Sequence, residues 1–469
     1  MNCKFSQVTR ISVFSFFCLL VGSAKADFEL GLKYYEEKNF DKAYHEFNQS
    51  AKFGDFSAQF NLGVMYYKGQ SVKQDVVAGF AWLALAAQDA EYKERGLHSQ
   101  IYNGFSADQK KQADRAYQEL FAQFNSAAIE RSLIPSYTGA SPLSTQLRPV
   151  KNVYPEYPKS MLRVEKMGWV DVLFSVEKDG TTRDHVVYSS THEIFSDSVV
   201  SALRKWQYEP ATIEGKAVAI HGMKIRFKFI LNDTKFDERK VNLLLAEKRE
   251  KAIAGDAHAQ FLYAYYLDVL PSFTKYTPKA DSEENPNKWY LKAAENGSAI
   301  SSFFLGQNVL NGNLCNADSN KSLAWLLRAS KTVVDAQYLL ALELLSGTRL
   351  QKNEEQAMYW LNKAVAGNST GNTAAKLRLA WILATHPDKD QRNGALAQQY
   401  VQSVDKNYRD KQTFYETAAA VAAENADFDA AVKWQEKVLD DAQTLELPLD
   451  NIRAQLNAYR SKQPLRVAS

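Results

Sequence analysis

The chain contains little cysteine. It holds three cysteines in 469 residues, and Cys3 and Cys18 lie within the first 26 residues. If that segment is removed, Cys315 has no partner for an intrachain disulfide, so the apolar core must stabilise the protein. A nucleophilic role for Cys315 would require a nearby histidine, and none lies within 50 residues of it in the sequence. We therefore interpret Cys315 as a thiol of a loop or of the core.

Net charge of one sign is also missing. The 57 lysines and arginines are nearly balanced by 54 aspartates and glutamates, and the whole excess lies in Lys4, Arg10 and Lys25. Beyond residue 26 the chain is formally neutral, which offers no general argument for a nucleic acid or an anionic membrane as partner. Glycine (21) and proline (12) are modest, whereas tyrosine (24) and phenylalanine (25) are abundant. This composition favours packed helices over turn-rich β structure.

No apolar run in the sequence reaches the roughly 20 residues that a bilayer core requires. The N-terminus carries two basic residues, then a mostly apolar run of about 12 residues at 11–22, then small residues at Ala24 and Ala26. These features predict a secretory signal peptide at residues 1–26, cleaved after Ala26. The alternative is an uncleaved N-terminal anchor in the inner membrane.

A repeat of about 35 residues is visible on both sides of the middle of the chain. Trp289, Trp325 and Trp360 each begin the same W-x-x-[KR] pattern, and they are 36 and 35 residues apart. An N-terminal copy occupies residues 58–87. Its small residues, such as Gly63, let paired helices approach closely, and stacked pairs bury one another's apolar faces.

This pattern resembles the Sel-like repeat, a subfamily of the tetratricopeptide repeat. Looser copies lie at 257–294, 299–330 and 335–365, and the tail at 413–438 resembles an ordinary tetratricopeptide hairpin. The resemblance implies an α-solenoid that presents a surface to protein or peptide. The repeated Trp, Tyr and Leu residues are interpreted as core, not as ligand contacts.

The middle segment changes period. Apolar residues alternate along Val170–Val176, a turn signal follows at 178–181, and a second short strand is expected near 183–189. Apolar residues then recur at helical spacing from Phe195 to Trp206, and a last strand is expected at about 218–231.

The order and spacing of these features resemble the C-terminal domain of the TonB family. The matching positions, interpreted as structural, are Tyr157, Pro158, Gly168, Asp179, Gly180, Trp206, Pro210 and Gly215. The resemblance implies a small α+β domain with an antiparallel sheet. The sequence therefore predicts a multidomain fold, with Sel-like or tetratricopeptide arrays at 27–147 and 233–469 flanking a TonB-like domain at 148–232.

In the TonB family the last strand accepts a short segment of an outer-membrane receptor by strand addition. The corresponding strand is about Ile220 to Phe229, and its basic face would favour an acidic peptide. The alternative is that these basic residues only protect a sheet edge from aggregation. The expected partner-binding residues are Ile220, Met223, Lys224, Ile225, Arg226, Phe227 and Lys228.

No catalytic residue, cofactor site or metal site is expected, because the sequence has no H-x-x-x-H spacing, Walker loop, G-x-S-x-G or Rossmann glycine pattern. TonB transducers have a retained anchor and a Pro-rich spacer, and they end with this domain, whereas here helical repeats follow it. The sequence thus favours a periplasmic, non-enzymatic adaptor that binds envelope proteins, with a TonB-dependent outer-membrane receptor as one candidate partner. The alternatives are an anchored TonB-type energy transducer and a cell-wall enzyme.

Overall fold

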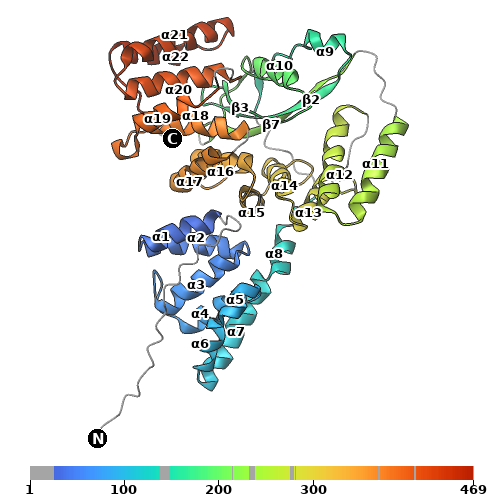
Figure 1. Cartoon of the computed structure of the whole chain (residues 1–469), viewed down its shortest axis with the longest axis vertical. Coiled ribbons are helices and arrows are strands. Elements are labelled where there is room, and N and C mark those ends of the chain that lie inside the picture. Colours follow the sequence, from blue (N-terminus) through green and yellow to red (C-terminus); the bar gives the residue numbers. More distant parts are fainter. Residues whose placement is uncertain are drawn as a thin grey trace.

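The structure is a computed structural model (Figure 1). It describes residues 26–137, 147–213, 215–231, 238–274, 279, 281–367, 370–405 and 408–467. The predicted signal peptide therefore lies outside the described residues, apart from Ala26. Most of the two expected joints between modules, at 138–146 and 232–237, also lies outside them.

Helices form both ends of the chain, as the repeats predict. The N-terminal helices are α1 (Ala26–Glu36), α2 (Phe40–Lys52), α3 (Phe56–Lys68), α4 (Val76–Ala86), α5 (Ala90–Arg95), α6 (Leu97–Asn103), α7 (Ala107–Phe124) and α8 (Ser126–Leu133). The C-terminal array contains α11 (Glu238–Ile253), α12 (Ala257–Val269), α13 (Pro286–Glu295), α14 (Ala299–Asn311), α15 (Ser319–Ser330), α16 (Val334–Ser346), α17 (Glu354–Ala366), α18 (Thr370–Thr385), α19 (Gly394–Gln402), α20 (Lys411–Glu424), α21 (Phe428–Thr444) and α22 (Asp450–Arg460). Short 3-10 turns, η2 (Leu270–Ser272) and η3 (Lys389–Gln391), interrupt its loops.

Side-chain caps define where these helices start and stop. The Asp75 carboxylate accepts hydrogen bonds from the backbone N–H groups of Val77 and Ala78, and Asp318 caps α15 in the same way through Lys321. Gly69 ends α3 with φ 71°, and Gly347 ends α16 with φ 66°. These are the positions where glycine is favoured, because a left-handed backbone costs it little.

The middle of the chain forms a small α+β unit between the helices (Figure 1). Its elements are β1 (Pro149–Lys151), α9 (Lys159–Arg163), β2 (Gly168–Val176), β3 (Thr182–Ser190), α10 (Glu193–Leu203), β4 (Gln207–Tyr208), β5 (Thr212–Ile213), β6 (Lys216–Ala217) and β7 (Ile220–Phe229). The main sheet is antiparallel, with strand order β3-β2-β7. The predicted strands and turn are confirmed, while α10 ends three residues before Trp206.

One face of this sheet packs on α10. Val170 and Val172 of β2 and Phe227 of β7 form a core with Phe195 of α10, and all four are buried. Trp206 closes the end of this core and donates its indole N–H to the Val153 carbonyl oxygen at 2.8 Å. Met223, Phe227 and Phe229 thus turn the apolar face of β7 toward α10.

The two helical arrays contact one another through the outer helices of the C-terminal array. The indole N–H of Trp325 in α15 donates to the carbonyl oxygen of Leu133 in α8 at 3.1 Å. The Gln356 amide of α17 donates to the Glu46 carboxylate of α2 at 2.6 Å. Cys315 is buried in the core of the C-terminal array, and burial raises its pKa to about 12, as expected for an unreactive core thiol.

Close helix approach in the N-terminal repeat depends on two glycines. A Cβ at Gly63 would lie 2.7 Å from the Leu83 Cγ and 2.9 Å from the Gly79 carbonyl oxygen, both on α4. The partner of Gly63 is thus Gly79. Ala84 of α4, another small residue of this repeat, packs instead against a cluster around Phe80. A side chain larger than hydrogen must push α3 and α4 apart.

We expect Gly63→Ala to destabilise the protein by about 1–3 kcal/mol through overpacking, although alanine has the higher helix propensity. Chemical denaturation monitored by circular dichroism measures this. Gly104→Ala is the control, because Gly104 has φ −79° and a Cβ there would lie 3.4 Å from its nearest neighbour. Equal midpoints for Gly63→Ala and the wild type would contradict the close-approach argument.

Candidate functional site

The second face of the sheet carries charged residues, and the structure covers it. Leu173 and Val186 on this face join the apolar core of the C-terminal array. The first helix of successive hairpins in the C-terminal array supplies the cover, namely α12, α14, α16, α18 and α20. Tyr188 of β3, for example, packs edge-on against Phe303 and Phe304 of α14, with ring centroids 6.1 and 5.8 Å away. The array therefore holds the TonB-like sheet against its own inner surface (Figure 1).

Arg226 is the centre of the first polar cluster on this face. Its Nε and Nη2 donate to the two carboxylate oxygens of Asp171, across the strand pair, at 2.6 and 2.9 Å. Its Nη1 donates to the backbone carbonyl oxygen of Asp268 in α12 at 2.6 Å. The Asp171 side chain is fully buried and that of Arg226 is 10% exposed. The pair is thus a bidentate, desolvated ion pair that also joins the sheet to the array.

Lys224 completes this cluster. Its ammonium lies 3.4 Å from the Asp268 carboxylate and 5.4 Å from the centre of the Phe304 ring. Burial alone would raise the pKa of Asp268, but Lys224 and Arg226 together lower it below its usual value. Tyr265 of α12 donates its hydroxyl to Asp171 at 3.3 Å.

A second cluster lies where β3 meets α18 and α20. The Arg378 guanidinium of α18 contacts the carboxylate of Asp184, which also accepts a hydrogen bond from Ser175. Arg183 pairs with Glu416 of α20 at 2.8 Å. Asp184 has φ 54° and lies within a register irregularity between β2 and β3, so a β-bulge turns its side chain into this cluster.

Two buried histidines belong to the same interface. The His185 Nδ1 lies 2.9 Å from the carboxylate of Asp410, the residue that caps α20. The His221 Nδ1 lies 2.8 Å from the Ser175 hydroxyl, and burial lowers the pKa of His221 to about 4. Among the described residues no three His, Cys, Asp or Glu side chains gather as a metal site would require.

The beginning of β7 is also held by the array. The Arg349 guanidinium donates to the His221 carbonyl oxygen and is paired with Glu343 of α16. The Thr348 hydroxyl donates to the Ala219 carbonyl oxygen at 3.2 Å. The carbonyl oxygens of Ala219 and His221 therefore already accept hydrogen bonds from the array.

The rest of the β7 edge has no partner strand among the described residues. The Trp169 carbonyl oxygen accepts a hydrogen bond from the Thr191 N–H, so the backbone of Trp169 faces the β3 side of β2. Because backbone direction alternates along a strand, its cross-strand partner Lys228 directs its N–H and C=O away from β2. Arg226 and Lys224 lie two and four residues before Lys228, so their N–H and C=O groups also point away from β2. Lys228 is exposed.

The expected binding residues thus fall into three groups. Met223, Ile225 and Phe227 contact the α10 core, and Ile220 packs at its border. The expected role of Lys224 and Arg226 needs correction, since both side chains are engaged with aspartates of this chain and are not available to select an acidic peptide. Lys228 is open to solvent. Partner binding by the strand stays a prediction.

The family-motif residues have structural positions. Tyr157 stacks edge-on against Phe195 and Phe229, and Pro158 is the N-cap of α9. A Cβ at Gly168 would lie 1.9 Å from the Thr191 hydroxyl oxygen. Asp179 accepts from the Thr181 N–H in the β2–β3 turn, and Gly180 has φ 83°. Trp206 lies at the end of the core beneath α10. Pro210 is an exposed residue after β4, and Gly215 has φ 76° between β5 and β6.

Sequence reasoning missed the acidic and basic residues that seat the sheet on the array. One signal was visible in the sequence, because Asp171 is the one charged residue within the strand 168–176, and it is buried in the structure. Asp268, which pairs with Lys224 and Arg226, lies on α12. Glu416 and Arg378 lie on α20 and α18, and Asp410 caps α20. No local pattern distinguishes these residues from solvated surface charges.

Comparison with known families supports the modular description. A profile of the Gram-negative bacterial TonB protein C-terminal domain matches residues 153–231. The Sel1 repeat profile matches 16–45, 56–90, 287–298, 299–331 and 334–369. The chain thus places a TonB C-terminal domain between Sel1 repeats. No curated protein sequence matches the chain.

Two solved structures are similar over most of the chain. One is a Sel1 repeat protein from Oxalobacter formigenes, with 16% identity, a TM-score of 0.32, and coverage of 90% of this chain and 84% of that one. The other is a protective antigen of uropathogenic Escherichia coli that displays an SLR fold, with 17% identity, a TM-score of 0.27, and coverage of 93% and 84%. In the part of the chain that is described, no helix has the length and apolarity to span a membrane.

We expect Arg226→Leu to destabilise the folded protein by about 3–5 kcal/mol, because the buried Asp171 carboxylate loses its partner. The control is Arg460→Leu, which breaks an ion pair with Glu436 whose side chains are 55% and 48% exposed. That change should cost no more than about 1 kcal/mol. Denaturant midpoints compare the two, and a similar small loss in both would show that the cluster is energetically unimportant.

The pH dependence of stability should carry the signature of His221. Burial disfavours the charged ring and lowers the pKa of folded His221 to about 4, below the ordinary histidine value of 6.5. As pH falls, the unfolded chain therefore binds the proton before the folded protein does. The contribution of His221 to the free energy of unfolding is complete above pH 6.5 and decreases by about 3 kcal/mol as the pH falls to 4. The His221→Asn protein should not show this loss of stability between pH 6.5 and 4. Parallel stability–pH curves for the two proteins between pH 6.5 and 4 would contradict it.

Proposed function

We propose that this protein is a non-enzymatic scaffold in the periplasm of a Gram-negative cell envelope, with a TonB-like domain that accepts an extended segment of an envelope protein by strand addition to β7. A TonB-dependent outer-membrane receptor is one candidate partner. Support comes from the family of the domain, from the flanking repeats and from the unpaired β7 edge. The protein-interaction role is the common property of both kinds of module.

The observation that carries the proposal is the contrast between the two edges of β7. One edge pairs with β2 along almost its whole length, and the other has no partner strand in the described part of the chain. Backbone acceptors at Ala219 and His221 are used by the array. The stretch available for strand addition is therefore the later part of β7, from Lys224 to Phe229.

In this arrangement affinity comes from repeated backbone hydrogen bonds, and the basic side chains contribute little selectivity.

The attachment of the sheet to the array argues against a role in energy transduction. A transducer needs its C-terminal domain free to reach a receptor, whereas buried ion pairs tie this domain to α12, α18 and α20. The geometry favours a fixed binding platform.

The informative change is to the backbone, and Lys228 is the position to alter. Lys228→Pro removes an outward N–H at an edge, where proline is tolerated. Arg226→Pro would be ambiguous, because it also removes the buried partner of Asp171. We expect Lys228→Pro to keep a thermal midpoint within a few degrees of the wild type while retention of envelope proteins by the immobilised full chain falls about tenfold.

The matched control is Lys228→Ala, which removes the side chain but keeps the N–H. It should retain solubilised envelope proteins as the wild type does, as quantified by mass spectrometry. Undiminished retention by a folded Lys228→Pro protein would exclude strand addition at β7.

A further inference from the structure

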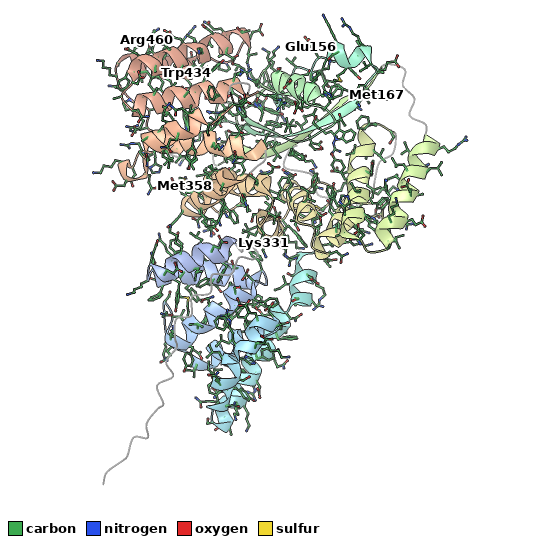
Figure 2. The ribbon with its side chains drawn as sticks, viewed as in Figure 1. Glu156, Met167, Lys331, Met358, Trp434 and Arg460 are labelled. Atoms are coloured by element: carbon green, nitrogen blue, oxygen red, sulfur yellow. The ribbon has the colours of Figure 1, made fainter. Side chains whose placement is uncertain are left out.

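The outer helices of the C-terminal array share an aromatic–cation element, and one copy differs from the others. The W-x-x-[KR] pattern places a cation over a tryptophan ring in α13, α15 and α21, where the cation lies 4.1, 4.7 and 4.1 Å from the ring centre. The tryptophans of α13, α15 and α17 are 4%, 0% and 1% exposed. Trp434 of α21 is not buried, and it lies among the last hairpins of the array (Figure 2).

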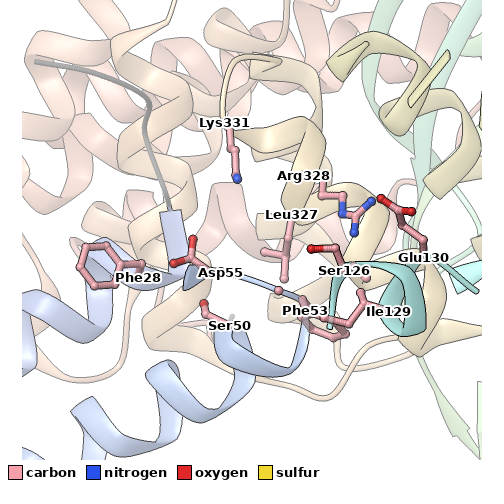
Figure 3. Close-up of a pocket in the computed structure, with 12 residues that line it drawn as sticks. Phe28, Ser50, Phe53, Asp55, Ser126, Ile129, Glu130, Leu327, Arg328 and Lys331 are labelled. Carbon is pink, nitrogen blue, oxygen red and sulfur yellow. The ribbon is translucent and has the colours of Figure 1, made fainter. Parts of the chain in front are cut away.

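At the other end of the array, a helix of the same chain covers an aromatic residue and a cation of the outer helices. Helix α1 lies against α15 and α17, where Glu29 accepts hydrogen bonds from the Tyr359 hydroxyl and from the Lys363 ammonium. In Figure 3, Arg328 of α15 and Glu130 of α8 point toward one another beside a cavity of about 220 Å³. An aromatic ring and a cation on the array thus receive a helix that carries a carboxylate.

The corresponding place at the C-terminal end is a groove between α19 and α21, with α20 as its floor. Its volume is about 860 Å³. The α21 wall presents Ala430, Trp434 and Lys437, which follow one another at helical spacing. Phe414 and Tyr415 of the floor pack on Trp434, with ring centroids 5.7 and 5.6 Å away.

The shape of this groove suits a helix. The floor residues that line it run from Lys411 to Asn425, which is roughly 21 Å of helix at about 1.5 Å per residue. Apolar and aromatic side chains form its centre, and lysines and amides, including Lys437 and Gln402, lie among its lining. Asp427 is the acidic residue among the lining side chains, and its carboxylate caps α21 by accepting from the Ala430 N–H.

We propose that the groove between α19 and α21 binds an acidic amphipathic helix of a partner protein. Its large apolar side chains pack on Phe414, Tyr415 and Trp434, and a carboxylate meets Lys437, as Glu29 meets Lys363 within this chain. The inference deepens the proposed scaffold function, because it names a second surface and the chemistry of its partner. It does not depend on the β7 edge.

The test uses the full chain and a fluorescein-labelled helical peptide of 14 residues, with Phe and Leu at i, i+3, i+4 and i+7 and Glu on the flanks. A counterpart with Lys in place of Glu reports the role of charge. Fluorescence anisotropy should show saturable binding of the acidic peptide and binding of the basic peptide that is about tenfold weaker or more. Equal affinity for both peptides, or no binding of the acidic one, would overturn the proposal.

Variants locate the binding. Trp434→Ala and Lys437→Glu should each raise the Kd for the acidic peptide about tenfold. Lys433→Glu, an exposed lysine of α21 that does not line the groove, should change it less than about threefold. Because Lys437 is exposed, Lys437→Glu should leave the fold intact, and it tests the groove even if Trp434→Ala destabilises the protein. Wild-type affinity in a folded Lys437→Glu protein, or an equal loss in Lys433→Glu, would contradict binding in the groove.

The Lys228→Pro protein separates the two surfaces. It should bind the acidic peptide with the wild-type Kd, since β7 lies on the inner side of the array. If Lys228→Pro fails to retain envelope proteins but binds the peptide, both proposals stand. A loss of peptide binding in this variant would show that the peptide occupies β7 and would overturn the groove.

Discussion

The rest of the structure depends on the desolvated ion pairing between one face of the sheet and the C-terminal array. Asp171 and Arg226 form a bidentate pair on adjacent strands, and Asp268 of α12 joins it from the array. Arg183 and Asp184 repeat the arrangement with α20 and α18. Charges removed from water in this way are tolerated only when every partner is in place. The position of the sheet on the array is therefore specified by these pairs as well as by apolar contact.

This seating has a consequence for binding. The inner surface of a helical solenoid is a common place for a protein or peptide ligand, and here the chain's own β-domain occupies it. What is left for partners is the backbone edge of β7 and the outer face of the array. On that outer face the N-terminal helices already cover α15 and α17, and the groove beside Trp434 is the corresponding place at the other end.

The sequence was sufficient for the parts of the fold that repeat or alternate. Strand Val170–Val176, the turn at Gly180 and the W-x-x-[KR] helices were predicted because periodicity and turn chemistry are local properties. The end of α10 was misplaced, because Trp206 continues the apolar pattern after the helix has stopped. Long-range electrostatics was not predictable: Lys224 and Arg226 look like solvated edge charges until Asp268 is placed beside them. The partial exposure of Trp434 was not predictable either, since only the packing of neighbouring helices distinguishes it from the buried Trp289, Trp325 and Trp360.

The central claim is that the TonB-like domain is seated rigidly on the array. Spin labels at Leu162→Cys on α9 and Lys433→Cys on α21, both exposed sites, measure it by double electron–electron resonance. Cys3 and Cys18 are replaced by serine, and the buried Cys315 thiol does not compete for label. A single narrow distance distribution, unchanged by added salt, is the predicted result. A broad distribution, with the domain sampling many positions relative to α21, would contradict the account.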